Sequence, residues 1–251
     1  MYIDTHCHLS IDDYDDIDKI VSDNKKSGIS KIVISGCTKD SIQESLELSK
    51  KYKDIYVTIG FHPSESNHTN INDINALLSQ IKEDKVVGIG EIGLDYHYGK
   101  EDINKQKKLF RDQMIIADKN NLPVVIHSRD ATKDTIDILK EFPKVKGIIH
   151  CFSGSVEVAE EYIKMGYLLG IGGVVTFKNS SLFKVIEKVG MENIVFETDS
   201  PYLTPEPFRG KKNSSKYIPF ISKKVAEILN VDEKVLRKKV FDNTINLFDL
   251  N

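Results

Sequence analysis

The feature that most constrains the fold is a regular alternation of short apolar runs with segments of helical spacing. The runs are rich in β-branched residues and are bounded by glycine, proline and polar residues, which is typical of buried strands. They are Tyr2–His8, Lys31–Gly36, Ile55–His62, Val86–Leu94, Pro123–Arg129, Gly147–Phe152, Tyr167–Gly173 and Ile194–Asp199. Apolar residues recur at helical intervals between them, most clearly at Ile17–Asn24, Phe110–Ala117, Val225–Leu229 and Val235–Leu247. Strands that alternate with helices form a parallel sheet.

Eight such strand and helix units are the number that a closed barrel requires. We therefore predict an α/β fold, a distorted (β/α)8 TIM barrel, with residues 1–251 forming a single domain. The 40% hydrophobic residues supply a substantial core. Uneven spacing between the runs is the reason to expect distortion. An open, doubly wound sheet is the structural alternative, but it seldom places ligands on so many strands.

Bulk properties narrow the classes of function. A net charge of −3 excludes a globally basic nucleic-acid binder, so affinity for nucleic acid must come from a local patch or from bound metal. The 3 cysteines show no CxxC spacing, which favours reduced thiols over a disulfide framework. No run approaches the roughly 18 apolar residues that span a bilayer, and the first residues predict a strand where a signal peptide would lie. We expect a cytoplasmic protein without membrane association.

Side chains suited to metal binding lie late in five of the apolar runs. They are His6, His8, Glu91, His127, His150 and Asp199. Barrels of this class form their active sites at the C-terminal ends of the strands, where these residues are expected. Taken alone, each of these six residues could equally be a core residue whose polar atoms are hydrogen-bonded within the protein. Burying all of them without partners would cost several kcal/mol, whereas a divalent metal would satisfy them together.

Spacing within the strands adds detail to this prediction. His6 and His8 lie two residues apart and therefore point to the same face, while Cys7 points to the other. Glu91 lies in a glycine-rich strand, and its carboxylate can bridge two cations or, alternatively, pair with a buried Lys or Arg. Glu197 shares the parity of Asp199, but Asp199 lies nearer the strand end. We therefore predict Asp199 as a ligand and as the base that orients water.

Cationic side chains follow two of the strands. Arg129 lies two residues after His127 and can bind a phosphate with both arms of its guanidinium group. The alternative for Arg129 is a salt bridge to a neighbouring carboxylate such as Asp130. After the last strand comes a basic cluster that suits either phosphate contact or a solvated loop: Arg209, Lys211, Lys212 and Lys216.

Five strings resemble one known family in the same order. DTHCHL, GEIGLDY, PVVIHSRDA, IHCFSGS and ETDSPYLTPEPFRGKKN are similar to the motifs of the TatD-like metal-dependent deoxyribonucleases, members of the amidohydrolase-like superfamily. The resemblance runs from Tyr2 to the final helix. It implies that one divalent ion is held by His6, His8, Glu91 and Asp199, and a second by Glu91, His127 and His150. It also implies substrate contacts from His62, Arg129, Arg209 and Asn213.

We therefore predict a deoxyribonuclease, with exonuclease action preferred, that hydrolyses DNA phosphodiester bonds at a binuclear metal centre. Glu91 and Asp199 are the predicted catalytic residues. The resemblance implies two divalent cations, Mg²⁺ or Mn²⁺ in activity, while the imidazole ligands also suit bound Zn²⁺ or another transition metal. DNA is the expected partner, and no obligate protein partner is expected.

Two other functions fit parts of this pattern. One is an amidohydrolase-type enzyme that cleaves C–N, lactone or small phosphoester bonds. Its binuclear relatives often bridge their metals with a modified lysine on the fourth strand, where this chain has Glu91. The other is a non-catalytic scaffold that uses metal for stability alone, which would require a closed coordination sphere.

Overall fold

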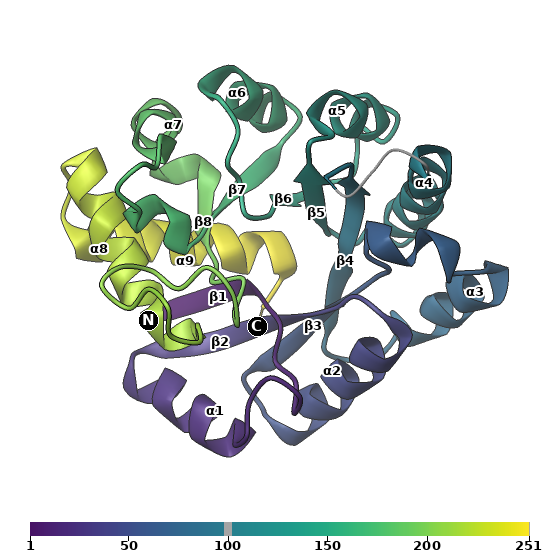
Figure 1. The fold of residues 1–251 in the computed structure, drawn as a ribbon, viewed down its shortest axis with the longest axis horizontal. Helices are drawn as coiled ribbons and strands as arrows, with labels where there is room; N and C mark the ends of the chain where they lie inside the picture. Colours follow the sequence, from purple (N-terminus) through teal and green to yellow (C-terminus); the bar gives the residue numbers. More distant parts are fainter. Residues whose placement is uncertain (98–101, 251) are drawn as a thin grey trace.

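The protein is described by a computed structural model covering residues 1–97 and 102–250. Eight parallel strands form one sheet in chain order, helices α1 to α8 lie around it, and α9 crosses one end of the barrel (Figure 1). The strands are β1 (Tyr2–Cys7), β2 (Ile29–Gly36), β3 (Ile55–Ile59), β4 (Val86–Asp95), β5 (Val124–Arg129), β6 (Gly147–Ile149), β7 (Tyr167–Ile171) and β8 (Ile194–Phe196). The predicted (β/α)8 barrel is confirmed.

Helices α1 to α7 lie between successive strands, and α8 and α9 follow the last strand. The α-helices are α1 (Ile17–Lys26), α2 (Lys39–Lys51), α3 (Ile71–Gln80), α4 (Ile103–Asn120), α5 (Thr132–Lys140), α6 (Val156–Lys164), α7 (Leu182–Val189), α8 (Ile218–Leu229) and α9 (Glu233–Phe248). Short 3-10 helices are η1 (Pro63–Asn67), η2 (Gly173–Thr176), η3 (Met191–Asn193) and η4 (Ser215–Tyr217). Local sequence sets several helix ends: Thr38 and Asn70 form capping boxes at α2 and α3. Within the described ranges, no helix has the length and apolarity needed to cross a membrane.

The barrel closes where the end of β1 meets the segment that follows β8. The backbone N–H of Asp199 donates to the His6 carbonyl at 3.0 Å, and the N–H of His8 donates to the Ser200 carbonyl at 2.7 Å. The Thr5 hydroxyl adds a hydrogen bond to the Phe196 carbonyl at 3.0 Å. These bonds bring polar residues from opposite ends of the chain to one point on the barrel rim.

Three strands end three residues earlier than their apolar runs predict. The sequence suggests strands that continue through His62, Phe152 and Asp199, but β3 ends at Ile59, β6 at Ile149 and β8 at Phe196. Strands could not continue through Cys151 and Asp199, because these residues have φ values of 46° and 53°. Backbone in this left-handed region cannot continue an extended strand. His150 and Asp199 therefore belong to the loops at the rim.

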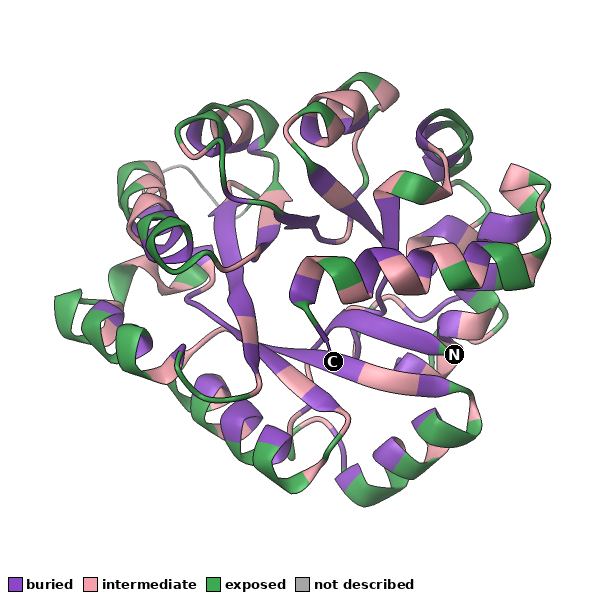
Figure 2. Ribbon diagram, turned by 180° about the vertical axis from the view of Figure 1, so that it is seen from behind, coloured by how far each residue is buried: buried purple, intermediate pink, exposed green. Residues whose placement is uncertain are grey.

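The interior of the barrel is filled from its N-terminal end. Ile3, Val33, Val125, Ile148 and Val195 point inward from the strands and pack with Phe248 and Leu250. Seen from behind, the C-terminus lies at the centre of the barrel (Figure 2). A larger apolar layer packs between the strands and the surrounding helices. The C-terminal segment thus occupies the N-terminal mouth, which leaves the opposite end of the barrel for polar side chains.

Candidate metal centre

All six predicted ligand residues converge at the C-terminal end of the barrel. Ligand atoms of His6, His8 and Glu91 lie within 4.8 Å of one another, and so do those of Glu91, His127 and His150. A third group of the same size joins His6, His150 and Asp199. β1, β4 and β5 and the loops after β6 and β8 therefore supply one continuous cluster of imidazoles and carboxylates.

The two carboxylate oxygens of Glu91 face different histidine pairs. Oε1 lies 2.8 Å from Nδ1 of His127 and 3.0 Å from Nε2 of His150. Oε2 lies 3.6 Å from Nε2 of His6 and 3.8 Å from Nε2 of His8. The Glu91 side chain itself is buried. Each oxygen of Glu91 therefore faces a different pair of histidines.

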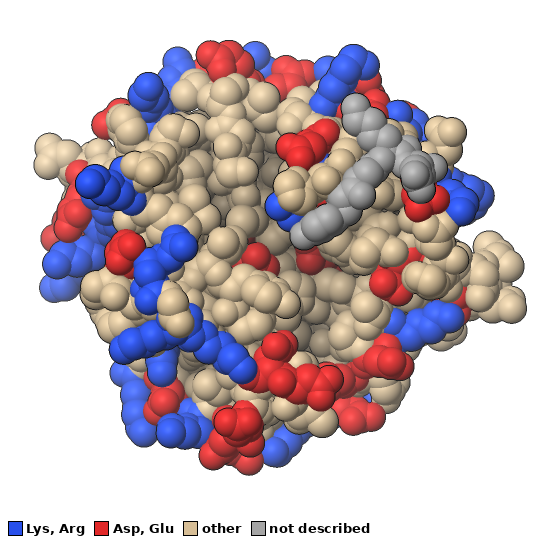
Figure 3. Space-filling model, in the orientation of Figure 1, with Lys and Arg blue, Asp and Glu red and all other residues tan. Residues whose placement is uncertain are grey.

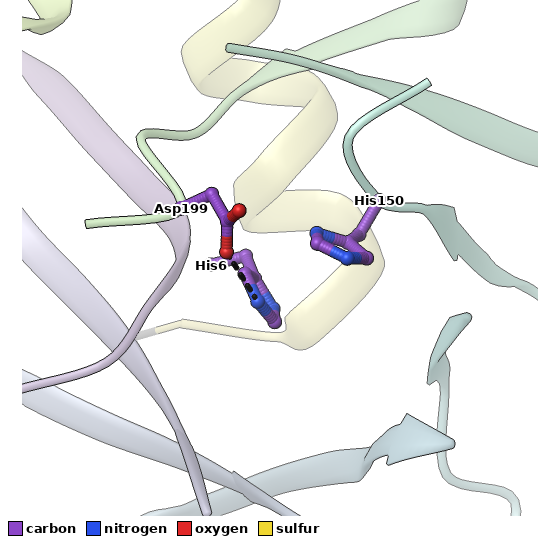
Figure 4. Close-up of side chains that lie close together, drawn as sticks. All are labelled: His6, His150 and Asp199. Carbon is purple, nitrogen blue, oxygen red and sulfur yellow. Dashed lines mark ion pairs between the residues drawn. The ribbon is translucent and has the colours of Figure 1, made fainter. Parts of the chain in front are cut away.

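Asp199 completes the first of these groups. Its Oδ1 lies 3.5 Å from Nε2 of both His6 and His8. Figure 4 shows the other oxygen of Asp199 directed away from His6, toward the side of the cluster where His150 lies. The rings of His6 and His150 face each other with their centroids 4.1 Å apart. Asp199 can therefore face a cation with one oxygen and accept a proton at the other.

The donor set fits a divalent metal better than a core of hydrogen bonds. Among the described residues, Nδ1 and Nε2 of His6 and Nδ1 of His150 are buried without a hydrogen-bond partner. Each such atom costs about 1–3 kcal/mol when left unpaired. A cation bound by Nε2 of His6 would remove part of that cost, and mixed imidazole and carboxylate ligands suit transition metals well.

Three of the four predicted substrate contacts lie on the same rim. His62 stands beside the cluster, with Nε2 3.9 Å from Oε1 of Glu91. Arg129 is exposed at the end of β5 and lines a cavity of about 510 Å³ that reaches His150. Arg209 is exposed on the loop after β8, where its guanidinium group lies 3.8 Å from the ring centroid of Phe177.

The fourth residue predicted to contact the substrate, Asn213, does not lie open on the rim. The structure buries it completely, so a substrate cannot reach its amide. Its Nδ2 donates to the carbonyls of Thr198 at 2.9 Å and Tyr202 at 2.5 Å, and its Oδ1 accepts from the N–H of Ser214 at 2.9 Å. With these hydrogen bonds made inside the protein, Asn213 holds the segment that presents Asp199.

Comparison with known proteins identifies the family to which this chain belongs. A family model described as TatD related DNase matches residues 3–249. The chain belongs to the TatD family. It is 39% identical to a Bacillus subtilis protein named uncharacterized metal-dependent hydrolase YabD, with 100% of both chains covered.

Solved structures agree with the assignment to the TatD family. The structure of YjjV, a TatD homolog from Escherichia coli, superposes with a TM-score of 0.92 at 27% identity, covering 100% of this chain and 98% of that one. Amidohydrolase 2 from Bifidobacterium longum, at 11% identity and a TM-score of 0.61, shares the fold alone. The two ligand groups that meet at Glu91 follow the same division that the family motifs imply.

The pKa shifts of His6, Glu91 and Asp199 in the TatD centre favour metal binding. Burial lowers the pKa of His6, and the nearby His150 lowers it further, so the neutral imidazole with its free lone pair is favoured. Burial alone would raise the pKa of Glu91, but His150 and His127 hold it well below its usual range. Burial also opposes ionisation of Asp199, and His6 and His8 nevertheless keep its pKa below the ordinary value.

Protons compete with metal for two histidines of the second group. Burial would lower the pKa of His150, but the Glu91 carboxylate raises it well above the ordinary value. The pKa of His127 is also raised, because Asp95 and Glu91 outweigh the effect of burial. A raised pKa means that these rings take up a proton at a higher pH than an ordinary histidine, and this proton must leave when a cation binds.

We therefore expect metal affinity to fall as the pH is lowered. The expected loss is up to about tenfold per pH unit for each histidine that must give up a proton, and it begins above the ordinary histidine pKa of about 6.5. Competition titrations with a chromophoric chelator, from about pH 9 to about pH 6, would measure it. An affinity that stays constant across this range would contradict the protonation states described above.

A carboxylate orients His127. Oδ2 of Asp95 lies 3.1 Å from Nε2 of His127, and a hydrogen bond of this kind fixes the ring and its tautomer at metal sites. Oε1 of Glu197 lies 3.6 Å from Nδ1 of His150, which is close enough for an ion pair but too long for a hydrogen bond. The sequence prediction missed Asp95, although it lies in the GEIGLDY string, and weighed Glu197 only as an alternative to Asp199.

Glycines make room for these contacts. Gly93 on β4 has a φ of 143°, and a Cβ there would lie 2.0 Å from the His127 carbonyl oxygen. A Cβ on Gly170 of β7 would lie 2.2 Å from Oε2 of Glu197. Larger residues at either position would displace a ligand histidine or the carboxylate that pairs with one.

Replacing Asp95 with asparagine is expected to lower metal affinity by about 10- to 100-fold while the protein stays folded. The amide keeps the size of the side chain but removes the charge that holds His127 in place. Asp130→Asn is the matched control, because Asp130 is exposed and lies 3.2 Å from His97, which is not a predicted ligand. Equal affinities of the two variants by calorimetric titration would show that Asp95 does not orient a ligand.

Cys37 is a further residue at this centre that the sequence pattern did not single out. Among the three cysteines Cys7 is buried, while Cys37 and Cys151 are partly exposed. Sγ of Cys37 lies 3.5 Å from Oε2 of Glu91 and 3.9 Å from Nδ1 of His8. The thiol therefore borders the first ligand group.

Proposed function

We propose that this TatD-family protein is a metal-dependent hydrolase that cleaves DNA phosphodiester bonds as an exonuclease. The observation that carries the proposal is Glu91, whose two oxygens face two separate histidine groups. A pair of cations that share one carboxylate is a common arrangement for in-line displacement at phosphorus. The family description supports DNA as the substrate, and the name of the Bacillus relative supports metal-dependent hydrolysis.

His6, His8, Glu91 and Asp199 would hold one ion, and Glu91, His127 and His150 the other. When bound, such ions supply Lewis-acid polarisation of a phosphoryl oxygen and lower the pKa of a water. Asp199 remains unprotonated at neutral pH, because His6 and His8 stabilise its charged form. Its oxygen directed away from His6 can accept the proton of the attacking water.

Residues beside the metal centre bind the substrate in this scheme. Arg129 can hold a phosphate through two parallel hydrogen bonds. Burial lowers the pKa of His62 to about 4, so this imidazole stays neutral and can donate a hydrogen bond to a phosphoryl oxygen. The cavity of about 510 Å³ beside His150 has the size of a small-ligand site. A space for one released nucleotide favours cleavage from an end.

The test is digestion of end-labelled single- and double-stranded oligonucleotides with Mg²⁺, Mn²⁺ or Zn²⁺, and again after chelation. We expect stepwise release of mononucleotides that stops on chelation and returns when metal is added. Internal cuts would contradict exonuclease action. Failure to cleave DNA with any of these metals, together with hydrolysis of amides, lactones or phosphotriesters, would instead establish the amidohydrolase-type alternative.

A further inference from the structure

An exposed tyrosine stands beside the metal centre. Tyr202 follows Asp199 in the loop after β8, and 60% of its surface is exposed. Its ring centroid lies 6.4 Å from that of His8, with an angle of 64° between the ring planes. Tyrosine combines a large apolar ring with a polar hydroxyl, and at this position the ring is open to a ligand bound at the centre.

The backbone beneath this ring is held firmly. The N–H of Tyr202 donates to the Asp199 carbonyl at 2.9 Å, and the carbonyl of Tyr202 accepts from the Asn213 side chain at 2.5 Å. The N–H of Asn213 donates in turn to the Pro201 carbonyl at 3.0 Å. A ring presented from a fixed backbone loses little freedom when a ligand packs against it, which favours binding.

The segment that follows Tyr202 carries three exposed cationic side chains. Arg209, Lys211 and Lys212 are exposed on the loop that leads to Asn213. Figure 3 shows Lys and Arg side chains gathered on one side of the central hollow and Asp and Glu side chains along another. A polyanion at the centre is therefore attracted to the side where Tyr202 lies and repelled from the acidic side.

We propose that Tyr202 is the base-stacking surface of the centre. The base next to the scissile phosphate packs on its ring, and the adjoining phosphates lie over the basic loop with Arg209, Lys211 and Lys212. The proposal rests on the proposed DNA hydrolysis and adds what holds the strand. Stacking accepts any base, so binding is independent of sequence. It also requires an unpaired base, so the occupant is a single-stranded end.

The test compares two oligonucleotides, one ordinary and one with tetrahydrofuran abasic residues at the end from which nucleotides are released. The measured quantity is the ratio of kcat/KM for the ordinary substrate to that for the abasic substrate. One stacked base is expected to make this ratio about 5 to 150 in the wild-type protein. Tyr202→Ala should bring the ratio near one, mainly through KM, and Tyr202→Phe should restore it.

Phe183→Ala is the control for loss of an exposed aromatic ring, since Phe183 lies on α7 and is 43% exposed. Its ratio should match that of the wild-type protein. A ratio near one in the wild-type protein, or an unchanged ratio in Tyr202→Ala, would overturn the role of Tyr202 while leaving DNA hydrolysis intact. Cleavage of neither substrate by the metal-loaded wild-type protein would overturn the proposed function and this inference with it.

Discussion

Replacing Glu91 with glutamine is expected to lower DNA hydrolysis at least about a thousandfold and to reduce the bound metal from two ions to one or none. Glutamine matches the size of glutamate but has one acceptor oxygen and an NH₂ group. Whichever way the amide turns, the NH₂ group faces either His127 and His150 or His6 and His8. One of the two cation sites must therefore lose its oxygen ligand.

Metal content by elemental analysis, thermal unfolding and the rate of nucleotide release would be measured on the same preparation. Glu161→Gln is the matched control, because Glu161 lies on α6 and pairs with Lys140 at the surface. We expect the control to keep both its metal content and its rate. A Glu91→Gln protein that retains two ions and at least a tenth of the wild-type rate would refute a bridging role for this residue.

Asp199→Asn is expected to separate catalysis from metal binding. The asparagine oxygen can still face His6 and His8 of the first ligand group. The second ligand group does not include Asp199 and stays intact, so at most one ion is lost. An amide cannot accept the proton of the attacking water, so the single-turnover rate should fall by about 10²–10⁴-fold. Ser200 is the next residue along the loop, and Ser200→Ala tests whether a change in this segment alone disturbs the rate.

The pH dependence of the residual rate gives a second readout for Asp199→Asn. If Asp199 accepts the proton, the variant should depend on hydroxide from solution and its rate should rise with pH more steeply than the wild-type rate. A single-turnover rate within tenfold of wild type, with the same pH profile, would assign the proton transfer to another group.

The sequence was sufficient to predict the barrel and the six converging residues, because both depend on local patterns. Each strand shows as a short apolar run, and ligands such as His6 and His127 lie within or directly after such runs. The ends of β6 and β8 were not predictable in the same way. Cys151 and Asp199 adopt positive φ values, and an apolar run contains no signal for that.

Residues that act through contacts distant in sequence could not be assigned from the pattern. Asn213 lies in a family string and was predicted to bind substrate, yet it is buried and bonds to Thr198 and Tyr202 in the loop after β8. Whether a polar side chain faces solvent or the protein depends on the path of the whole loop. The same holds for Asp95, whose role depends on which nitrogen of His127 faces Glu91.

The most direct test of the central claim is an anomalous-diffraction measurement on crystals grown with Mn²⁺. We expect two manganese peaks on either side of Glu91, one contacting His6, His8 and Asp199 and the other contacting His127 and His150. A single peak, or two peaks of which neither or only one contacts the Glu91 carboxylate, would contradict the bridged binuclear centre on which the proposed function depends.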